Sequence, residues 1–157
     1  MSETAVELRF RVRMAALLLM ALSATSACTA PKAGCSVPTE LEPGLCDARL
    51  PPVRSVAIEK NGALQEGIKN YEYDCSVFVL DEKAVRRYFA RTRRVDGPNP
   101  NHDVAWSACH ASGTLRFSDG RRADWLIEQS SVARLWIAGA DAIVLYCPDC
   151  DFAPFTQ

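Results

Sequence analysis

The chain has 157 residues, with 18 Lys and Arg against 19 Asp and Glu, so its formal charge is −1. This balance provides no positive field for gripping nucleic acid, and a hydrophobic share of 48% argues against a disordered chain. The length suits one domain with its own core, and the odd count of seven cysteines has to be explained.

The first 27 residues are typical of an export signal. Arg9, Arg11 and Arg13 precede an apolar run at 14–22, and small residues fill 23–27. The apolar run is far shorter than the roughly 20 residues that a transmembrane helix needs. We therefore interpret residues 1–27 as a signal peptide.

Ala27-Cys28, with small residues before it, resembles the lipobox of bacterial lipoproteins. In that family the cysteine becomes the new N-terminus and carries the lipid, so the resemblance implies a membrane anchor on Cys28. Thr29 stands where some lipoproteins carry an inner-membrane retention Asp, so the resemblance implies an outer-membrane lipoprotein facing the periplasm. Thr25 departs from the commonest Leu, and Thr25-x-Ala27 also fits ordinary cleavage, which would leave a soluble periplasmic protein.

Residues 28–52 are predicted to be a Pro-rich tether. The stretch contains five prolines and no hydrophobic period, and proline removes a backbone donor, so we expect no regular structure here. Cys35 and Cys46 lie 11 residues apart in this stretch. They are expected to pair and to close a small loop.

Residues 53–157 predict an α+β domain, a small antiparallel sheet of five or six strands with one amphipathic helix packed on it. Short segments separated by Gly-containing turns favour antiparallel pairing over β-α-β crossovers. Asn61-Gly62 is expected to form a hairpin turn after the first strand. The expected strands are 53–58, 71–80, 106–117, 122–128, 133–137 and 142–147.

The helix is expected to begin after Asp81, an N-cap residue, and to run for about 14 residues. Val85, Tyr88, Phe89 and Thr92 have the spacing of one buried helical face. The stretch 95–103, with its glycine and prolines, should then form an exposed loop.

Six cysteines remain if Cys28 carries a lipid, and in an oxidising compartment they should form three structural disulfides. Once Cys35 and Cys46 are paired, three pairings of the other four stay open. We favour Cys147 and Cys150 each reaching back to one of the two earlier cysteines. These six disulfide candidates are Cys35, Cys46, Cys75, Cys109, Cys147 and Cys150.

Cys147-Pro-Asp-Cys150 also has the C-x-x-C spacing of thiol redox sites and of half a zinc site. Redox catalysis needs the first cysteine at a helix N-terminus, and the short end of the chain, with Pro154, leaves no room for a helix. Exported thiols more often oxidise than bind metal. No metal and no cofactor are therefore predicted.

Tyr73-Asp74-Cys75-Ser76 resembles the nucleophile motif of NlpC/P60 cysteine peptidases. The resemblance implies Cys75 as a thiolate nucleophile and a histidine, either His102 or His110, as its base. Val77 departs from the Gly of that family, and the two histidines follow Cys75 at the short distances of 27 and 35 residues. The peptidase is therefore the alternative hypothesis for the function.

The candidate binding residues are a basic face and an aromatic side chain. Arg86, Arg87, Arg91 and Arg94 could form a patch for an acidic partner or for lipid headgroups. Trp136 is expected on the sheet face opposite Leu135 and Ile137, and exposed aromatic residues are common binding anchors. The carboxylates Asp119, Asp124 and Glu128 are interpreted as turn and solvent-face residues.

A signal, a tether and a small domain point first to a non-enzymatic binding module of the cell envelope. In organisation only, this arrangement resembles lipoproteins that neutralise toxic hydrolases or lysozymes in the bacterial periplasm. The resemblance implies an inhibitor or immunity-type role. The expected partner is an envelope protein or a cell-wall component, with the membrane reached through the lipid on Cys28 and with no nucleic acid bound.

Overall fold

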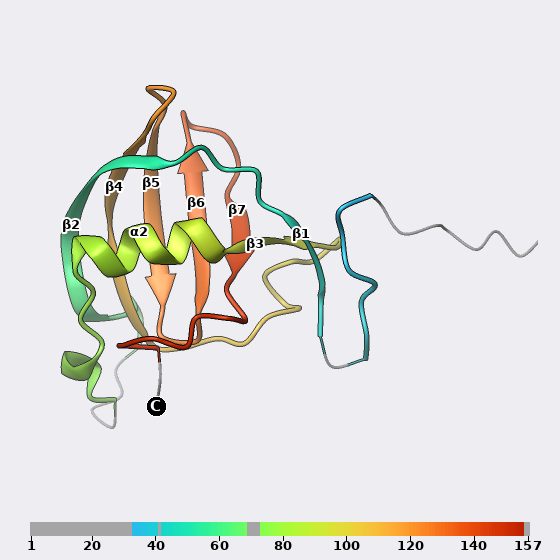
Figure 1. Ribbon diagram of the computed structural model, residues 1–157. Coiled ribbons are helices and arrows are strands. Elements are labelled where there is room, and N and C mark those ends of the chain that lie inside the picture. The colour runs from blue at the N-terminus through green and yellow to red at the C-terminus, as the bar shows by residue number, and fades with distance from the viewer. Residues whose placement is uncertain (1–32, 41, 69–72, 156–157) are drawn as a thin grey trace, which may run out of the picture. The chain divides into compact units, whose positions relative to one another are not determined.

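The computed structural model describes residues 33–40, 42–68 and 73–155 (Figure 1). The predicted signal peptide at 1–27 and the predicted lipid site Cys28 lie outside these ranges. Within them, no helix has both the length and the apolar character that crossing a bilayer requires.

The described part of the chain forms one seven-stranded antiparallel sheet in the order β1-β3-β7-β6-β5-β4-β2. One α-helix, α2 (Glu82–Arg91), crosses one face of this sheet in front of β4, β5 and β6 (Figure 1). The α+β fold of an antiparallel sheet with one helix is thus confirmed, whereas the expected count of five or six strands is wrong. The strands are β1 (Gly44–Asp47), β2 (Val53–Leu64), β3 (Arg93–Asp96), β4 (Cys109–Phe117), β5 (Arg122–Glu128), β6 (Val132–Ile137) and β7 (Ile143–Tyr146).

Two short strands that the sequence did not predict account for the higher count. β1 pairs with β3, and Leu45 lies opposite Val95. Both side chains are buried with Val132 and Val144 in a small cluster of their own. The expectation of no regular structure in 28–52 is therefore wrong for Gly44–Asp47, because the seven residues between Pro43 and Pro51 leave room for a short strand once it has a partner.

Helix α2 begins as predicted and ends earlier. The carboxylate of Asp81 accepts a hydrogen bond from the backbone N–H of Ala84 at 2.7 Å, which satisfies a helix-end donor. The chain turns to extended backbone at Thr92, so the helix has 10 residues instead of about 14, and Arg94 lies in β3. Val85, Tyr88 and Phe89 are buried as the spacing predicted, and Thr92 is buried just beyond the helix.

The segment around residues 71–80 is not the predicted strand. In its described part it forms only a single turn of 3-10 helix, η1 (Cys75–Val77). Cys75, Phe78 and Leu80 are buried, but Val77 is 64% exposed and Val79 is 57% exposed, so the segment contacts the core with one side only. The alternation that resembled a doubly buried strand belongs to a one-sided loop.

The predicted hairpin turn at Asn61-Gly62 is also wrong, because β2 continues through it to Leu64 with shifts in register. The side-chain amide of Asn61 donates to the carbonyl of Leu80 at 2.7 Å and its oxygen accepts from the N–H of Leu80 at 2.9 Å. This side chain replaces a strand partner at the sheet edge. It fixes the 78–80 segment beside β2.

Candidate functional site: a basic groove beside the helix

Three disulfides use the six predicted cysteines in the pairs Cys35–Cys46, Cys75–Cys109 and Cys147–Cys150. The first pair is the predicted one. The preferred long-range links from Cys147 and Cys150 are wrong, because β6 and β5 separate β7 from β4. Three strand spacings amount to about 14 Å, beyond the reach of a disulfide. Cys147 instead closes the turn that directly follows β7.

The residues of the peptidase hypothesis do not form a reactive centre in this oxidised structure. The sulfur of Cys75 is bonded to Cys109, and a nucleophile would need it as a thiolate. Asp74 accepts hydrogen bonds from the backbone and hydroxyl of Ser76, and these bonds lower its pKa. His102 is exposed and lines a shallow acidic recess with Asp103. The hypothesis therefore requires a reduced form of the protein.

The second histidine, His110, is buried in the sheet with 5% of its surface exposed. It lies directly opposite Glu128 across β4 and β5, and its Nδ1 has no hydrogen-bond partner in the described part of the chain. Burial lowers the pKa of His110, and Lys60 lowers it further, while the charge of Glu128 opposes the shift. The imidazole is therefore neutral near pH 7.

Glu128 is the polar group that sequence reasoning placed wrongly. It is fully buried and pairs with Arg134, and its carboxylate accepts the backbone N–H of Ser107 at 3.0 Å. Arg134 also donates from Nε to the side-chain oxygen of Asn101 at 3.2 Å. The expectation of a solvent-face residue failed because the loop between β3 and β4 closes over this position. The sequence signal for this ion pair was the acidic Glu128 on β5 and the basic Arg134 on β6, the two strands of one hairpin.

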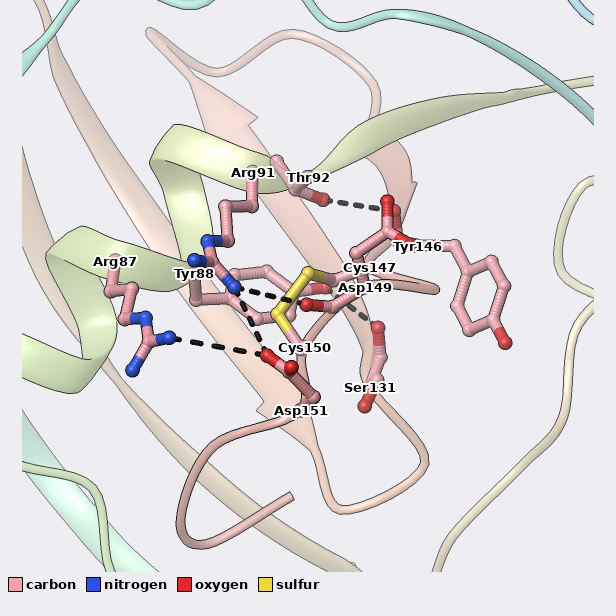
Figure 2. The surroundings of a disulfide bond; sticks show 10 residues. All are labelled: Arg87, Tyr88, Arg91, Thr92, Ser131, Tyr146, Cys147, Asp149, Cys150 and Asp151. Atoms are coloured by element: carbon pink, nitrogen blue, oxygen red, sulfur yellow. Dashed lines mark hydrogen bonds and ion pairs between the residues drawn. A yellow bond between two sulfur atoms is a disulfide. The ribbon is translucent and has the colours of Figure 1, made fainter. Parts of the chain in front are cut away.

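The predicted arginine face is divided by the C-terminal segment. Asp151 lies 3.1 Å from a guanidinium nitrogen of Arg91 and 3.9 Å from one of Arg87, and Figure 2 shows both guanidinium groups directed at it. Arg91 also donates to the carbonyl of Asp149 at 3.1 Å. The guanidinium of Arg87 lies 4.1 Å from the ring centre of Phe152. Two of the four predicted arginines thus have partners in the C-terminal segment.

A groove of about 710 Å³ lies on the other side of the helix, between α2 and the segment that connects β1 to β2. Its volume falls in the roughly 300–1,000 Å³ range of ligand-binding clefts. Four arginines and one acidic residue contribute to its lining. The lining residues are Asp47, Ala48, Arg49, Leu50, Pro51, Pro52, Val53, Arg86, Phe89, Ala90, Arg91, Thr92 and Arg93.

The pairing of β1 with β3 builds this groove. Asp47 lies opposite Arg93 in the sheet, so the chain leaving β1 has to run beside the C-terminal end of α2. Arg86 donates to the carbonyl of Val53 at 2.6 Å and forms an ion pair with Glu82 at 3.5 Å. The Arg86 contact joins the two walls. The disulfide at Cys46 fixes the strand that leads into the groove.

Arg94 lies beside the groove rather than in it. It is exposed on β3 and lines a smaller recess of about 380 Å³ that also contains Arg49 and Asp47. Of the four predicted arginines, the structure therefore gathers Arg86 and Arg91 in the groove and leaves Arg94 at its margin. Arg49 and Arg93 join them and were not among the predicted binding residues.

The three tryptophans occupy different environments. Trp125 is buried and packs edge-on against Phe89 of the helix, with ring centres 6.5 Å apart. Trp136 is half-buried on the opposite sheet face, as alternation with the buried Leu135 predicted. Trp106 is 55% exposed in the loop before β4. Of the three indoles, only that of Trp125 fills the core.

Comparison with protein-family models, with curated proteins and with solved structures found no match to this chain.

Proposed function

We propose that this protein is an exported, lipid-anchored, non-enzymatic binding module of the bacterial cell envelope. The observation that carries the proposal is the arginine-lined groove beside α2. Its guanidinium groups offer several fixed donors to an anion, and its apolar carbon offers a contact surface beside them. Such a lining suits recognition of a partner's surface.

The disulfides support the exported location. Three of them in one small chain are typical of proteins that fold in an oxidising compartment such as the periplasm. Anchoring rests on Cys28, and the variant Cys28→Ala tests it. We expect the natural chain in the outer-membrane fraction with a lipid-modified N-terminus, and the variant in the soluble periplasmic fraction. Equal membrane association of both chains would refute the anchor.

The partner we propose is an envelope protein or a cell-wall component, with an inhibitor or immunity-type role against an envelope hydrolase as the specific form. A rigid binding surface supports this role, because a surface fixed before contact loses little entropy on binding. The groove has that property, since the Cys35–Cys46 disulfide precedes one wall and the Arg86 contact with Val53 joins it to the other.

The test is capture of crosslinked partners from a cell-envelope extract with the tagged, oxidised protein, followed by mass spectrometry. Reduced and unfolded protein of the same sequence is the control. Enrichment of one envelope protein or cell-wall fragment on the folded chain alone supports the proposal. Equal capture by both forms contradicts it, as does a free, alkylatable Cys75 together with cleavage of cell-wall peptides, the result that the NlpC/P60-like alternative predicts.

A further inference from the structure

We propose that the groove binds an extended acidic segment of the partner protein, with the carboxylates of that segment on Arg49 and Arg93. This inference rests on the proposed function and specifies the chemistry of the partner. Four arginines and one aspartate line the groove, although the whole chain carries a formal charge of −1. Glu82 and Asp151 neutralise two of these arginines, so Arg49 and Arg93 against Asp47 leave an excess of one positive charge in the lining, and this excess attracts an acidic ligand.

Two of these four arginines are committed to partners within the chain. Arg86 is held by Glu82 and by the carbonyl of Val53, and Arg91 is held by Asp151. In the described part of the chain, Arg49 and Arg93 take part in no ion pair. Arg93 donates one hydrogen bond, to the carbonyl of Leu45 at 2.8 Å. A ligand carboxylate can therefore add charge-assisted hydrogen bonds at these two without displacing an internal ion pair.

The apolar part of the lining favours a peptide over a free anion. Leu50 and Val53 are partly buried against the core, and Phe89 is buried, so their surfaces facing the groove form a fixed apolar floor. Pro51 and Pro52 stiffen the wall and have no N–H to donate, so a peptide cannot add here as another sheet strand. Recognition must use the ligand's side chains, acidic ones for the arginines and an apolar one for the floor.

The protein's own C-terminal segment places an acidic and an apolar side chain together against arginines on the neighbouring side of α2. The carboxylate of Asp151 contacts the guanidinium groups of Arg87 and Arg91, and the ring of Phe152 lies against Arg87 (Figure 2 shows the ion pairs). An acidic residue followed by an aromatic one thus fits arginines presented by this helix. The groove offers the same two kinds of contact.

A bilayer of anionic lipids also attracts arginines, but the shape of this site favours a peptide. The guanidinium groups line a recess between two walls, and Arg86 and Arg93 are half-buried in it. A single extended chain can enter a recess of this kind, whereas a flat array of headgroups reaches mainly convex surfaces.

The test uses fluorescence anisotropy of a labelled peptide that carries four glutamates around one phenylalanine, titrated with the full oxidised protein. We expect binding that weakens with added salt, and a loss of about tenfold in affinity for Arg49→Gln, the loss that removal of one charged hydrogen bond gives. Arg49 is exposed and lies outside the strands, so this variant should fold. Far-UV circular dichroism and the thermal midpoint check that it does.

The matched control is Arg116→Gln, which removes the same charge from β4. Arg116 is exposed, and its neighbours Leu115 and Phe117 are buried under the helix, so its side chain lies on the other face of the sheet. We expect less than a twofold change for this variant. Equal losses for the two variants would refute the inference, because they would indicate attraction to net charge alone.

Two further arms separate the possible ligands. Inorganic phosphate should not displace the peptide at equal concentration, and phosphatidylglycerol vesicles should not bind in an Arg49-dependent manner. Displacement by phosphate, or vesicle binding that Arg49→Gln abolishes, would overturn the peptide assignment. A partner captured equally by the natural chain and by Arg49→Gln would refute this inference and leave the proposed function standing, whereas capture of no partner by the natural chain would refute the proposed function.

Discussion

Removal of Arg134 should destabilise the protein far more than removal of an exposed arginine. The side chain of Glu128 is 1% exposed, and Arg134 is its ion-pair partner. Arg134→Met would leave the carboxylate buried with the Ser107 amide and a weak contact from Ser130 at 3.4 Å. Removing one partner of a buried pair reduces the free energy of unfolding by about 3–5 kcal/mol, and we expect a loss in this range.

The double variant Glu128→Gln/Arg134→Met separates the charge from the packing. A neutral amide at 128 can still accept the N–H of Ser107, and no buried charge remains, so the double variant should recover most of the stability lost in the single one. Urea unfolding under oxidising conditions, followed by the fluorescence of the buried Trp125, measures both. A single variant that loses less than about 1 kcal/mol, or a double variant that loses as much as the single, would refute the reasoning.

Three other changes test the sheet, the buried histidine and the longest disulfide loop. Gly113→Ala should lower the free energy of unfolding by about 3 kcal/mol in urea, because a Cβ there would overlap the carbonyl oxygen of Ala57 on β2; no loss would contradict this close approach. Burial lowers the pKa of His110 below 6.5, so on acidification the unfolded chain takes up a proton at this histidine before the folded chain does. The free energy of unfolding should therefore fall as the pH drops below 6.5, until the pKa of the folded chain is reached. His110→Gln should flatten this fall in urea titrations between pH 7 and 5, and an unchanged slope would refute its cause. Replacement of Cys75 and Cys109 by Ala opens a loop with a sequence separation of 34 and should lower the free energy of unfolding by about 4 kcal/mol. This is roughly twice the loss expected when the Cys147–Cys150 bridge, with a separation of 3, is removed, and equal losses would contradict the loop-entropy account.

Local signals were enough to predict the helix and most of the sheet. Asp81 as N-cap and the spacing of Val85, Tyr88 and Phe89 are properties of a few consecutive turns, and the structure retains them. The four-strand meander after residue 105 pairs neighbours along the chain, so its turns mark its strands. Such elements are predictable because the partner of each residue is close in sequence.

β1 and β3, which pair with each other across about fifty residues, were not predictable in this way. β1 becomes a strand because Leu45 can be buried opposite Val95, about fifty residues later in the chain. Nothing within these four residues, which directly follow Pro43, indicates that partner. At 73–80 the prediction failed in the opposite way, because a strand was expected where the chain forms a loop. The alternating residues resemble a strand, but the Cys75–Cys109 bond and the hydrogen bonds of Asn61 hold the segment as a loop.

The same cause explains why only half of the candidate site was predictable. Arg86 and Arg91 were identified because helical spacing places them on the outer face of α2, whereas Arg49 belonged to a stretch that the sequence presented as a tether. The β1–β3 pairing, with Asp47 opposite Arg93, brings that stretch beside the helix and turns a solvated arginine face into one wall of a groove. The charge was visible in the sequence, but the recess that gives it selectivity depends on a contact between two four-residue strands.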